Sequence, residues 1–411
     1  MNLSFITKYK PAIILSLALT VFLASCKGTT TTPGPTDPTG PTDPGTKSWV
    51  VTTFAGIAGS LGSANTGTDD EGNPVVAKFN KPSGVAVDAS GNVYVADTYN
   101  HTIRKITITT SEAGVVTATV STLAGIAGSL GSANTGTDDE GNPVVAKFNY
   151  PHGVAVDSSG ILYVADTHNN CIQKITSAGD VTTVTTFAGI AGSSGSENTG
   201  TDDEGNPVVA KFNRPKGVAV DASGNVYVAD TDNHTIRKIT PGKLVTTLAG
   251  EGSILGSHQD GTGTAARFDG PTGVAVDSSG NLYVADFNNL RIRKITPEPE
   301  RKVTTLAGGT DGSNDGTGTE AQFNFPHAVA VDSSGNLYVA DMFNNRIRKI
   351  TPKKLVTTIA GGGDISVGDH QDGTGTAARF DVPSGVAVDL SSGILYVADT
   401  DNHCIRKIEY K

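Results

Sequence analysis

GVAVDASGNVYVADTYNHTIRKIT, residues 84–107, decides the fold of this 411-residue chain, because near copies of it return five more times. These copies begin at Gly153, Gly217, Gly273, Ala328 and Gly385. The Asp of each YVAD motif marks one copy, and successive markers are 55 to 69 residues apart: Asp97, Asp166, Asp230, Asp286, Asp341 and Asp399. A repeat of this length indicates one array of equivalent units rather than several unrelated domains.

Each copy is expected to form β-strands. The segments GVAVD and (V/L)YVAD are continuous apolar runs, which are typical of strands buried on both faces. The Ser-Gly-Asn between them fits a tight hairpin turn, because Gly accepts a positive φ. The polar corner ADTxNH precedes a third strand, and VTTLAG or VTTFAG forms a fourth. Long helices are not expected, because the chain has 50 glycines and each costs a helix interior about 1 kcal/mol.

The fourth strand follows only the first five copies, because the chain ends shortly after the sixth. The missing segment, VVTTFAG, lies at the N-terminal side as residues 50–56. A circular array would use it as the outer strand of the last blade, which removes exposed sheet edges. An open solenoid would instead need polar caps. The sequence therefore predicts an all-β, six-bladed β-propeller over residues 48–411, closed by its N-terminal strand.

The consensus PxGVAVDxxGNxYVADxxNxxIRKI resembles the NHL repeat over nearly all of residues 49–411. Known NHL arrays are similar to six-bladed propellers, in agreement with the strand count. The resemblance implies a fold and not a reaction, since members of the family include ligand-binding modules, lyases and lactonase-like hydrolases.

Residues 1–25 have the organisation of a signal peptide. Lys8 and Lys10 precede an apolar run, residues 12–24, that is shorter than the about 20 residues needed to span a bilayer. The run ends in Leu-Ala-Ser-Cys, which resembles the lipobox of bacterial lipoproteins and implies lipidation of Cys26. By resemblance to enterobacterial sorting, Lys27 favours the outer membrane. We expect a lipid-anchored protein of the bacterial cell envelope, with residues 26–47 as lipidated Cys and Pro/Thr/Gly-rich tether.

The charge balance disfavours nucleic acid as a partner. The net charge of the chain is −10, and removal of the signal peptide takes away two more lysines, whereas nucleic-acid binding requires Lys and Arg to neutralise phosphates. The basic residues of the IRKI segments, such as Arg237 and Lys238, are expected to lay their stems on the strands with charged heads in water. Cys171 and Cys404 are too far apart for a disulfide and are expected to be unpaired and partly buried.

Residues repeated in every blade are interpreted as structural, and residues that differ between blades as candidates for a site. Asp97 and Asn100 have equivalents in all six copies and are expected to hold turns. A phenylalanine before each inner strand is expected to anchor the loop between blades: Phe79, Phe148, Phe212, Phe268, Phe323 and Phe380. The position after each Pro differs and is expected at the mouth of the central channel, as a candidate ligand site: Ser83, His152, Lys216, Thr272, His327 and Ser384.

His152 and His327 are three blades apart and therefore expected on opposite sides of the channel. This arrangement is similar to that of the peptidyl-hydroxyglycine lyases, propellers whose zinc is bound by histidines from Pro-His segments. A catalytic zinc usually has three protein ligands, whereas this chain supplies two Pro-His pairs and Lys216 would repel a cation. No cofactor is therefore expected. A divalent metal at the two histidines, a polar channel lining and a small-ligand site remain as alternatives.

The loops into blades 1 to 3 are nearly identical, and each contains an acidic triplet. The triplets are Asp69, Asp70 and Glu71; Asp138, Asp139 and Glu140; and Asp202, Asp203 and Glu204. These loops are expected to share one face with the ADTxNH corners and to make half of that face acidic. They represent either recent duplication with solvated tips or a docking surface for a protein or other envelope macromolecule. Calcium is disfavoured, because DDEGN lacks the spaced carboxylates of an EF-hand loop.

The leading hypothesis is a non-enzymatic, lipid-anchored scaffold that binds another macromolecule with its loop face. The alternative is a lyase or lactone hydrolase that uses the channel mouth, and a third possibility is structural spacing in the envelope. The sequence contains no Ser-His-Asp order, phosphate-binding Gly loop or close Cys/His cluster. It therefore favours binding over catalysis.

Overall fold

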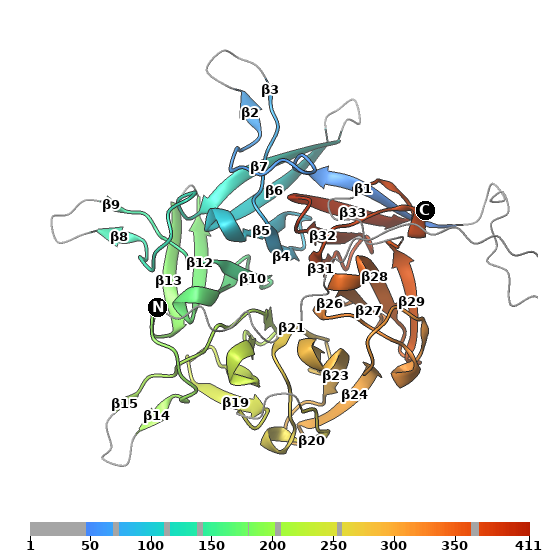
Figure 1. Cartoon of the computed structure of the whole chain (residues 1–411). Coiled ribbons are helices and arrows are strands. Elements are labelled where there is room, and N and C mark those ends of the chain that lie inside the picture. The colour runs from blue at the N-terminus through green and yellow to red at the C-terminus, as the bar shows by residue number, and fades with distance from the viewer. Residues whose placement is uncertain are drawn as a thin grey trace, which may run out of the picture. The chain divides into compact units, whose positions relative to one another are not determined.

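Each repeat folds as an antiparallel blade of four strands, and the six blades form a ring around a central channel (Figure 1). Blade 1 contains β4 (Pro82–Val87), β5 (Val93–Asp97), β6 (Thr102–Thr110) and β7 (Val116–Ala124). Blade 2 contains β10 (Pro151–Val156), β11 (Leu162–Asp166), β12 (Cys171–Ala178) and β13 (Val181–Gly189). Blade 3 contains β16 (Val218–Val220), β17 (Val226–Asp230), β18 (Thr235–Ile239) and β19 (Val245–Ala249).

Blades 4 to 6 carry a fifth, two-residue strand at their outer edge. Blade 4 contains β21 (Pro271–Val276), β22 (Leu282–Asp286), β23 (Arg291–Ile295), β24 (Lys302–Gly308) and β20 (Gly261–Thr262). Blade 5 contains β26 (Pro326–Val331), β27 (Leu337–Asp341), β28 (Arg346–Ile350), β29 (Leu355–Ala360) and β25 (Gly316–Thr317). Blade 6 contains β31 (Pro383–Val388), β32 (Leu395–Asp399), β33 (Cys404–Tyr410), β1 (Trp49–Ala55) and β30 (Gly373–Thr374).

This computed structural model describes residues 47–68, 74–110, 116–137, 143–179, 181–201, 207–252, 257–362 and 370–411. They belong to one compact unit, residues 47–411. The predicted signal peptide, Cys26 and most of the tether lie outside the described residues. Within the described part of the chain, no helix is long and apolar enough to cross a membrane.

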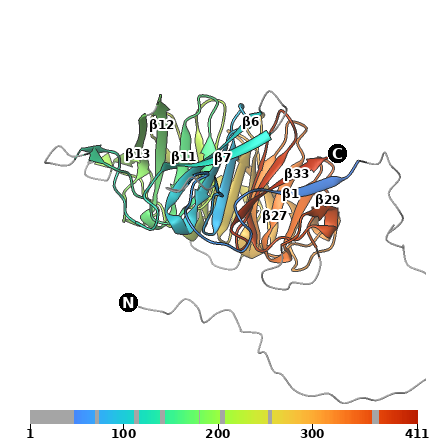
Figure 2. The same cartoon turned by 90° about the horizontal axis from the view of Figure 1, so that it is seen from above.

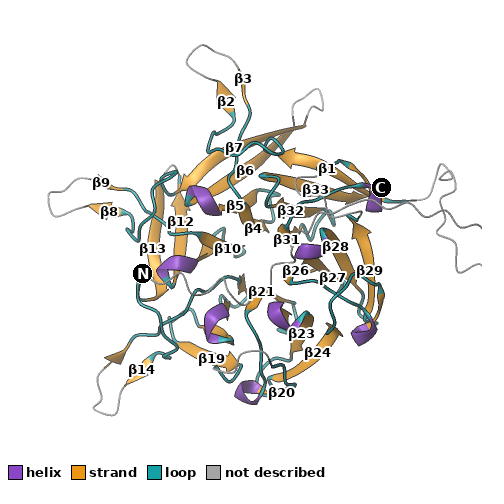
Figure 3. Ribbon diagram, viewed as in Figure 1, coloured by secondary structure: helices purple, strands orange, loops and turns teal. Residues whose placement is uncertain are grey.

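The helical segments of the described residues are 3-10 turns of three residues, drawn in purple in Figure 3. One group follows the second strand of blades 1 to 5: η1 (Thr98–Asn100), η2 (Thr167–Asn169), η3 (Thr231–Asn233), η5 (Phe287–Asn289) and η7 (Met342–Asn344). The other group follows the fifth strands: η4 (Gly263–Ala265), η6 (Gly318–Glu320) and η8 (Gly375–Ala377). We call the face of the ring that carries the first group the corner face.

The ring is closed between the two ends of the propeller, as the strand count predicts. β1 is the outer strand next to β33, and Trp49 pairs with Tyr410, Val51 with Ile408. In Figure 1 the blue N-terminal strand lies beside the red C-terminal strand, and Figure 2 shows the same closure from the side. The six-bladed propeller is therefore confirmed, and its last blade is built from both ends of the array.

The core lies between neighbouring blades. Each of the six apolar clusters combines residues of two blades, as where Tyr94 and Ala96 of blade 1 meet Val154 and Val164 of blade 2. The second strand of every blade is buried along its whole length, as expected for a strand covered on both faces. The six predicted phenylalanine anchors are also buried, so the blades are held together largely by apolar packing.

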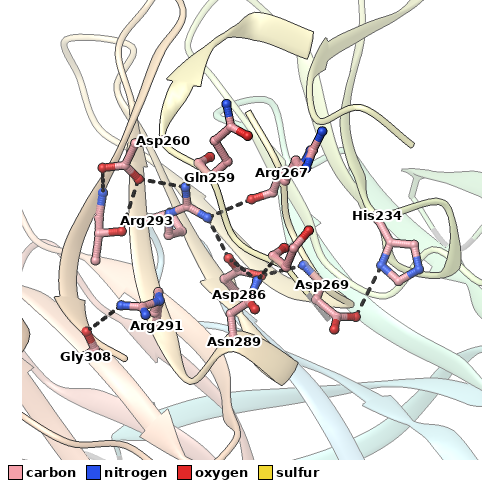
Figure 4. A network of polar contacts seen from close by, with 12 residues as sticks. His234, Gln259, Asp260, Arg267, Asp269, Asp286, Asn289, Arg291, Arg293 and Gly308 are labelled. Carbon is pink, nitrogen blue, oxygen red and sulfur yellow. Dashed lines mark hydrogen bonds and ion pairs between the residues drawn. The ribbon is translucent and has the colours of Figure 1, made fainter. Parts of the chain in front are cut away.

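The arginine of each IRKI segment is buried, which makes the expectation of a solvated head wrong for Arg237. Its Nη1 donates to Asp230 Oδ2 at 2.8 Å, and both side chains have 0% exposure. The equivalent pair Arg293–Asp286 appears in Figure 4, where the guanidinium also donates to the carbonyl of Arg267. The physical reason is that the repeated Asp is inaccessible to water and therefore needs a cation and hydrogen bonds.

Blade 2 is the exception, because Gln173 replaces the buried arginine. Asp166 accepts hydrogen bonds from the Asn149 amide and from Asn169, but no cation of the described residues pairs with it. Burial raises the pKa of Asp166 to about 7. The Oε1 atom of Gln173 is buried without a hydrogen-bond partner. Blade 2 thus keeps a buried carboxyl group without the guanidinium that accompanies its five equivalents.

Neither described cysteine forms a disulfide. Cys171 and Cys404 are both buried with 0% exposure, so the expectation that they are unpaired is confirmed, but they are fully rather than partly buried. They begin β12 and β33 at the position that other blades fill with Thr or Arg. Burial raises the pKa of the Cys404 thiol well above its usual value.

Candidate functional site at the channel mouth

Close contact between the inner strands makes the channel narrow. A Cβ atom on Gly84 would lie 2.2 Å from the carbonyl oxygen of His152 in the next blade, and one on Gly385 would lie 2.0 Å from that of Ser83. Such distances leave no room for a side chain at these two positions, so glycine there allows neighbouring inner strands to approach; blade 5 has Ala328 at the equivalent position. The residue before this position lines the channel in each blade.

The structure places all six predicted channel residues around one central cavity of about 90 Å³: Ser83, His152, Lys216, Thr272, His327 and Ser384. The cavity opens next to the corner face, because Ser83 Oγ lies 2.5 Å from Oγ1 of Thr98, the first residue of η1. This volume is smaller than that of a protein cavity of about 150 Å³ that binds benzene. A larger ligand could place one group inside and would extend over the corner face.

Four of the six side chains form a ring of hydrogen bonds, each donating to the carbonyl of the equivalent residue in the next blade. Ser83 Oγ donates to His152 O at 3.0 Å, and Thr272 Oγ1 donates to His327 O at 2.7 Å. His327 Nδ1 donates to Ser384 O at 2.7 Å, and Ser384 Oγ donates to Ser83 O at 3.3 Å. These side chains are held by the scaffold.

His152 and Lys216 interrupt the ring. Within the described residues, neither side chain forms a hydrogen bond or ion pair, although both line the cavity. Lys216 Nζ lies 5.8 Å from the ring centroid of Phe287, a cation–π distance. The inner strand of blade 3 also starts later than its equivalents, at Val218. Two polar groups on neighbouring blades thus face the cavity without a partner among the described residues.

The two histidines lie opposite each other across the channel, with ring centroids 5.6 Å apart. Burial, together with the charge of Lys216, lowers the pKa of His327 to about 4. Burial and the same charge also lower the pKa of His152 well below its usual value. Both imidazoles are therefore neutral near pH 7, and Lys216 supplies the positive charge at the mouth, with a pKa that burial lowers from its usual value.

The corner face has an apolar sector on blades 4 and 5. In four blades a corner threonine donates to the carbonyl of the proline in the next blade: Thr98, Thr167, Thr231 and Thr400. Phe287 and Met342 replace this threonine in blades 4 and 5. The ring of Phe287 lies 4.9 Å from that of Phe325, which lies 5.3 Å from that of Phe343. We call these three residues the phenylalanine sector.

A second contact between corners is also missing at the junction of blades 4 and 5. At the other junctions, a His or Asn at the end of the corner turn accepts a hydrogen bond from a backbone N–H of the next blade. The donor is the residue before the proline that starts the inner strand, as where Tyr150 N donates to His101 Nδ1 at 3.2 Å. Blade 4 has Leu290 at this place, which cannot accept. Its neighbour is Phe325. Apolar packing thus replaces polar contacts at the junction closest to Lys216 and His327.

A second aromatic group lies on blades 1 and 2, around Tyr150. Its ring centroid is 4.6 Å from those of His101 and His168 and 5.1 Å from that of Tyr99. Tyr99 is 48% exposed. Aromatic side chains from both sides of the ring therefore flank the mouth, and only one of the two groups is purely apolar.

The hairpins that carry the acidic triplets leave the ring at its rim. Their stems are β2–β3 (Gly67–Thr68, Pro74–Val75), β8–β9 (Gly136–Thr137, Pro143–Val144) and β14–β15 (Gly200–Thr201, Pro207–Val208). Figure 1 shows these stems outside the ring of blades. The triplets Asp69–Glu71, Asp138–Glu140 and Asp202–Glu204 lie outside the described residues. The described stems point away from the channel.

Comparison with known proteins gives the repeat its family. The NHL repeat pattern fits residues 79–106, 148–175, 212–239, 268–295, 323–350 and 380–408, one segment for each blade. The chain is an NHL-repeat protein. Human NHL repeat-containing protein 2 is 31% identical over 316 residues, which cover 68% of this chain and 42% of the human protein. This NHL chain thus spans less than half the length of that relative.

Two solved structures share the propeller fold. A Bacteroides thetaiotaomicron protein of unknown function has 20% identity and a TM-score of 0.63, with 89% of this chain and 76% of the other covered. An auxiliary nutrient binding protein from the same species has 18% identity and a TM-score of 0.61, with 89% and 77% covered. At this identity the likeness shows the fold alone.

Within the described part of the NHL propeller, no group of three His, Cys, Asp or Glu side chains is arranged to hold a metal ion. The two channel histidines share the mouth with the charge of Lys216, an unfavourable setting for a cation. The phenylalanine sector was missed from the sequence. Its signal was the loss of the corner threonine at Phe287 and Met342, which an alignment of the six repeats displays.

Proposed function

We propose that this NHL propeller is a non-catalytic binding protein that takes a small ligand at the channel mouth on its corner face. The observation that carries the proposal is the interrupted ring of hydrogen bonds. Four channel side chains are tied to the scaffold, whereas His152 and Lys216 face the cavity unpaired among the described residues. An unpaired polar group in a partly buried place costs stability, and a ligand that binds there would offset that cost.

Binding is favoured over catalysis by the protonation of the two histidines. A general base works best when its pKa lies near the working pH. The pKa of His327 is about 4, and its Nδ1 is engaged by Ser384 O. The pKa of His152 is also well below its usual value. Both are weak bases, so a lyase or lactone hydrolase mechanism lacks a suitably tuned proton acceptor at the mouth.

The remaining parts of the proposal concern where the protein acts. We propose that Cys26 is lipidated and that residues 28–47 tether the propeller to the bacterial envelope, with the outer membrane as the preferred site. The support is the lipobox-like end of the apolar run and the Pro-rich composition of the tether. Palmitate labelling of cells that express the chain tests the anchor, with Cys26→Ala as the control that should remove the label.

The hairpins of blades 1 to 3 are proposed as contacts for a protein or other envelope macromolecule. Their stems extend outside the ring (Figure 1), and each has an exposed valine directly after its second strand: Val76, Val145 and Val209. A partner that engages several hairpins would gain from their repetition. Replacement of the three acidic triplets by Asn and Gln should weaken capture of such a partner and leave small-ligand binding unchanged.

Saturation-transfer NMR on the full chain in detergent, with a small-metabolite library, tests binding at the mouth. Signals from a true ligand should be lost in Phe287→Ala, because this ring lies beside Lys216. They should persist in Tyr410→Ala, which removes an exposed aromatic ring at the end of β33 that does not line the channel cavity. Ligands that respond to neither change, or equally to both, would contradict a binding site at the channel mouth.

A further inference from the structure

We propose that the ligand of the channel mouth is a small carboxylate attached to an apolar ring. The carboxylate contacts Lys216 and His152, and the ring packs on the phenylalanine sector. This inference rests on the proposed function and adds the chemical class of the ligand to it. Three observations support it: the unpaired cation, the size of the cavity, and the position of the aromatic rings.

The unpaired cation selects the charge of the ligand. Salt bridges hold other charged groups on the corner face, such as Lys81 with Asp401 at 3.2 Å. Lys216 has no carboxylate within ion-pair distance among the described residues. The carboxylate of Asp232 acts on it electrostatically from farther away, and that carboxylate lies 3.7 Å from the Arg214 guanidinium. A cation without a counter-charge in a narrow channel attracts an anion and repels a second cation.

The hydrogen-bonding capacity of the mouth selects a carboxylate among anions. Lys216 offers ammonium donors, and neutral His152 offers one N–H together with one lone pair. His327 Nδ1 already donates to Ser384 O, so its Nε2 presents a lone pair. Two separate donors on neighbouring blades match the two oxygens of one carboxylate. A dianionic phosphate would bring two negative charges to a mouth whose two histidines are neutral and whose positive charge is that of Lys216.

The cavity limits how much of the ligand enters the channel. Its volume of about 90 Å³ is well below the about 150 Å³ of a protein cavity that binds benzene, so it has room for a carboxylate but not for a ring. The rest of the molecule must therefore lie over the corner face. Phe287 is the side chain next to Lys216, and Phe325 and Phe343 continue the apolar surface outward. Phe343 is 42% exposed. Such a surface favours an apolar ring over a polar chain.

Three molecules with the same body and different head groups test the inference on the full chain in detergent: 3-phenylpropionate, 3-phenylpropan-1-ol and 3-phenylpropylamine. Calorimetry or NMR titration should show the carboxylate binding at least tenfold more tightly than the alcohol, and the amine more weakly still. Acetate, which has the head group without the ring, should also bind at least tenfold more weakly. An alcohol or amine that binds as tightly as the carboxylate would overturn the inference.

Lys216→Met tests the residue. It keeps the length of the side chain, removes the charge, and is expected to fold because it removes an unpaired, partly buried cation. Affinity for 3-phenylpropionate should fall at least tenfold, while the weak affinity for the alcohol is unchanged. Lys81→Met, which removes another lysine of the corner face, should change neither. Equal carboxylate affinity in Lys216→Met and the wild type would refute the role of Lys216.

The outcomes separate the inference from the proposed function. Library ligands that are lost in Phe287→Ala but show no preference for a carboxylate would overturn the ligand class and leave the binding site in place. Ligands that are insensitive to Phe287→Ala would overturn both. Carboxylate binding that needs both Lys216 and Phe287 supports both.

Discussion

Replacing Gln173 by Arg should stabilise the propeller at neutral and alkaline pH, because it supplies the cation that blade 2 lacks. In blade 1, Arg104 Nη1 donates to Asp97 Oδ2 and to the carbonyl of Lys78, and Nη2 donates to the carbonyl of Ala64. The loop of blade 2 repeats this loop sequence. It also repeats the backbone bond that positions the acceptors, from Lys147 N to Ala133 O at 2.9 Å. The guanidinium would therefore meet acceptors already in place.

The size of the effect follows from the carboxyl group. The pKa of Asp166 is about 7, against about 6 for the Asp97, Asp230 and Asp399 side chains that have an arginine. One pKa unit corresponds to about 1.4 kcal/mol. Hydrogen bonds from the guanidinium add about 1 kcal/mol each, and the ordering of the arginine side chain removes about 2 kcal/mol. We expect a gain of about 1 to 2 kcal/mol at pH 8.

The stability gained by Gln173→Arg should depend on pH, because it depends on the charge of Asp166. The folded-state pKa of Asp166 is raised above the unfolded value of 3.8, so the folded protein binds more protons and loses stability as the pH rises from about 4 to about 7. With arginine beside Asp166, its pKa should be about 6, so the loss of stability should end about one pH unit lower. The advantage of Gln173→Arg should therefore be largest at pH 8 and should vanish at pH 5, where Asp166 is protonated and an added arginine has no counter-charge.

Thermal and urea unfolding between pH 5 and pH 9 measure the effect. For a unit of this size, about 1 kcal/mol corresponds to a little over 1 °C in Tm, so a rise of about 1 to 3 °C is expected at pH 8. The matched control is Arg237→Gln, which gives blade 3 the composition of blade 2 and should cost about 3 to 5 kcal/mol. A Tm gain that does not change with pH, or a loss at pH 8, would refute the argument.

Three further predictions concern the channel and the core. Gly84→Ala should destabilise the fold by about 3 kcal/mol in urea unfolding, because its Cβ would lie 2.2 Å from a backbone carbonyl. Gly91→Ala, with φ +79° and open space around it, should cost about 1 to 2 kcal/mol. Stability should fall as the pH drops from about 6.5 to about 4, because the lowered pKa of His327 makes the folded state bind fewer protons; His327→Gln should flatten this slope in acid melts. Cys171, fully buried, should react with Ellman's reagent only after unfolding, and fast reaction in the native protein would show that blade 2 opens.

The periodic features of the fold could be predicted from the sequence, because they depend on counting. The displaced VTTFAG segment required β1 to complete the last blade, and the phenylalanine anchors recur at one position in every repeat. The burial of Arg237 could not be found in this way, because the adjacent Arg and Lys of an IRKI segment suggest side chains exposed to solvent. The informative signal was an Asp seven residues before an Arg in five repeats, which suggests pairing once Gln173 is seen as the exception.

The candidate site was only partly accessible from the sequence. The Pro-X-Gly pattern of five blades, with Pro-His-Ala in blade 5, leads to the six channel residues, because one strand start per blade must face the axis. The phenylalanine sector was not accessible by the same argument, since it depends on which side chains of two neighbouring blades meet. Phe287 and Phe325 belong to different repeats and to different positions of the repeat. Their contact follows from the junction of blades 4 and 5 rather than from any motif.

The repeated architecture supplies its own control for the importance of Lys216. The fold needs only a small hydroxyl side chain at this position, since Ser83, Thr272 and Ser384 each donate to the next blade and complete the ring. A lysine in blade 3 makes no such bond among the described residues and leaves a charge without a partner. Serine at this position would be the more stable solution for the scaffold alone. Natural proteins depart from the most stable choice at functional sites, and we therefore propose the interruption of the ring, rather than the ring itself, as the functional part of the channel.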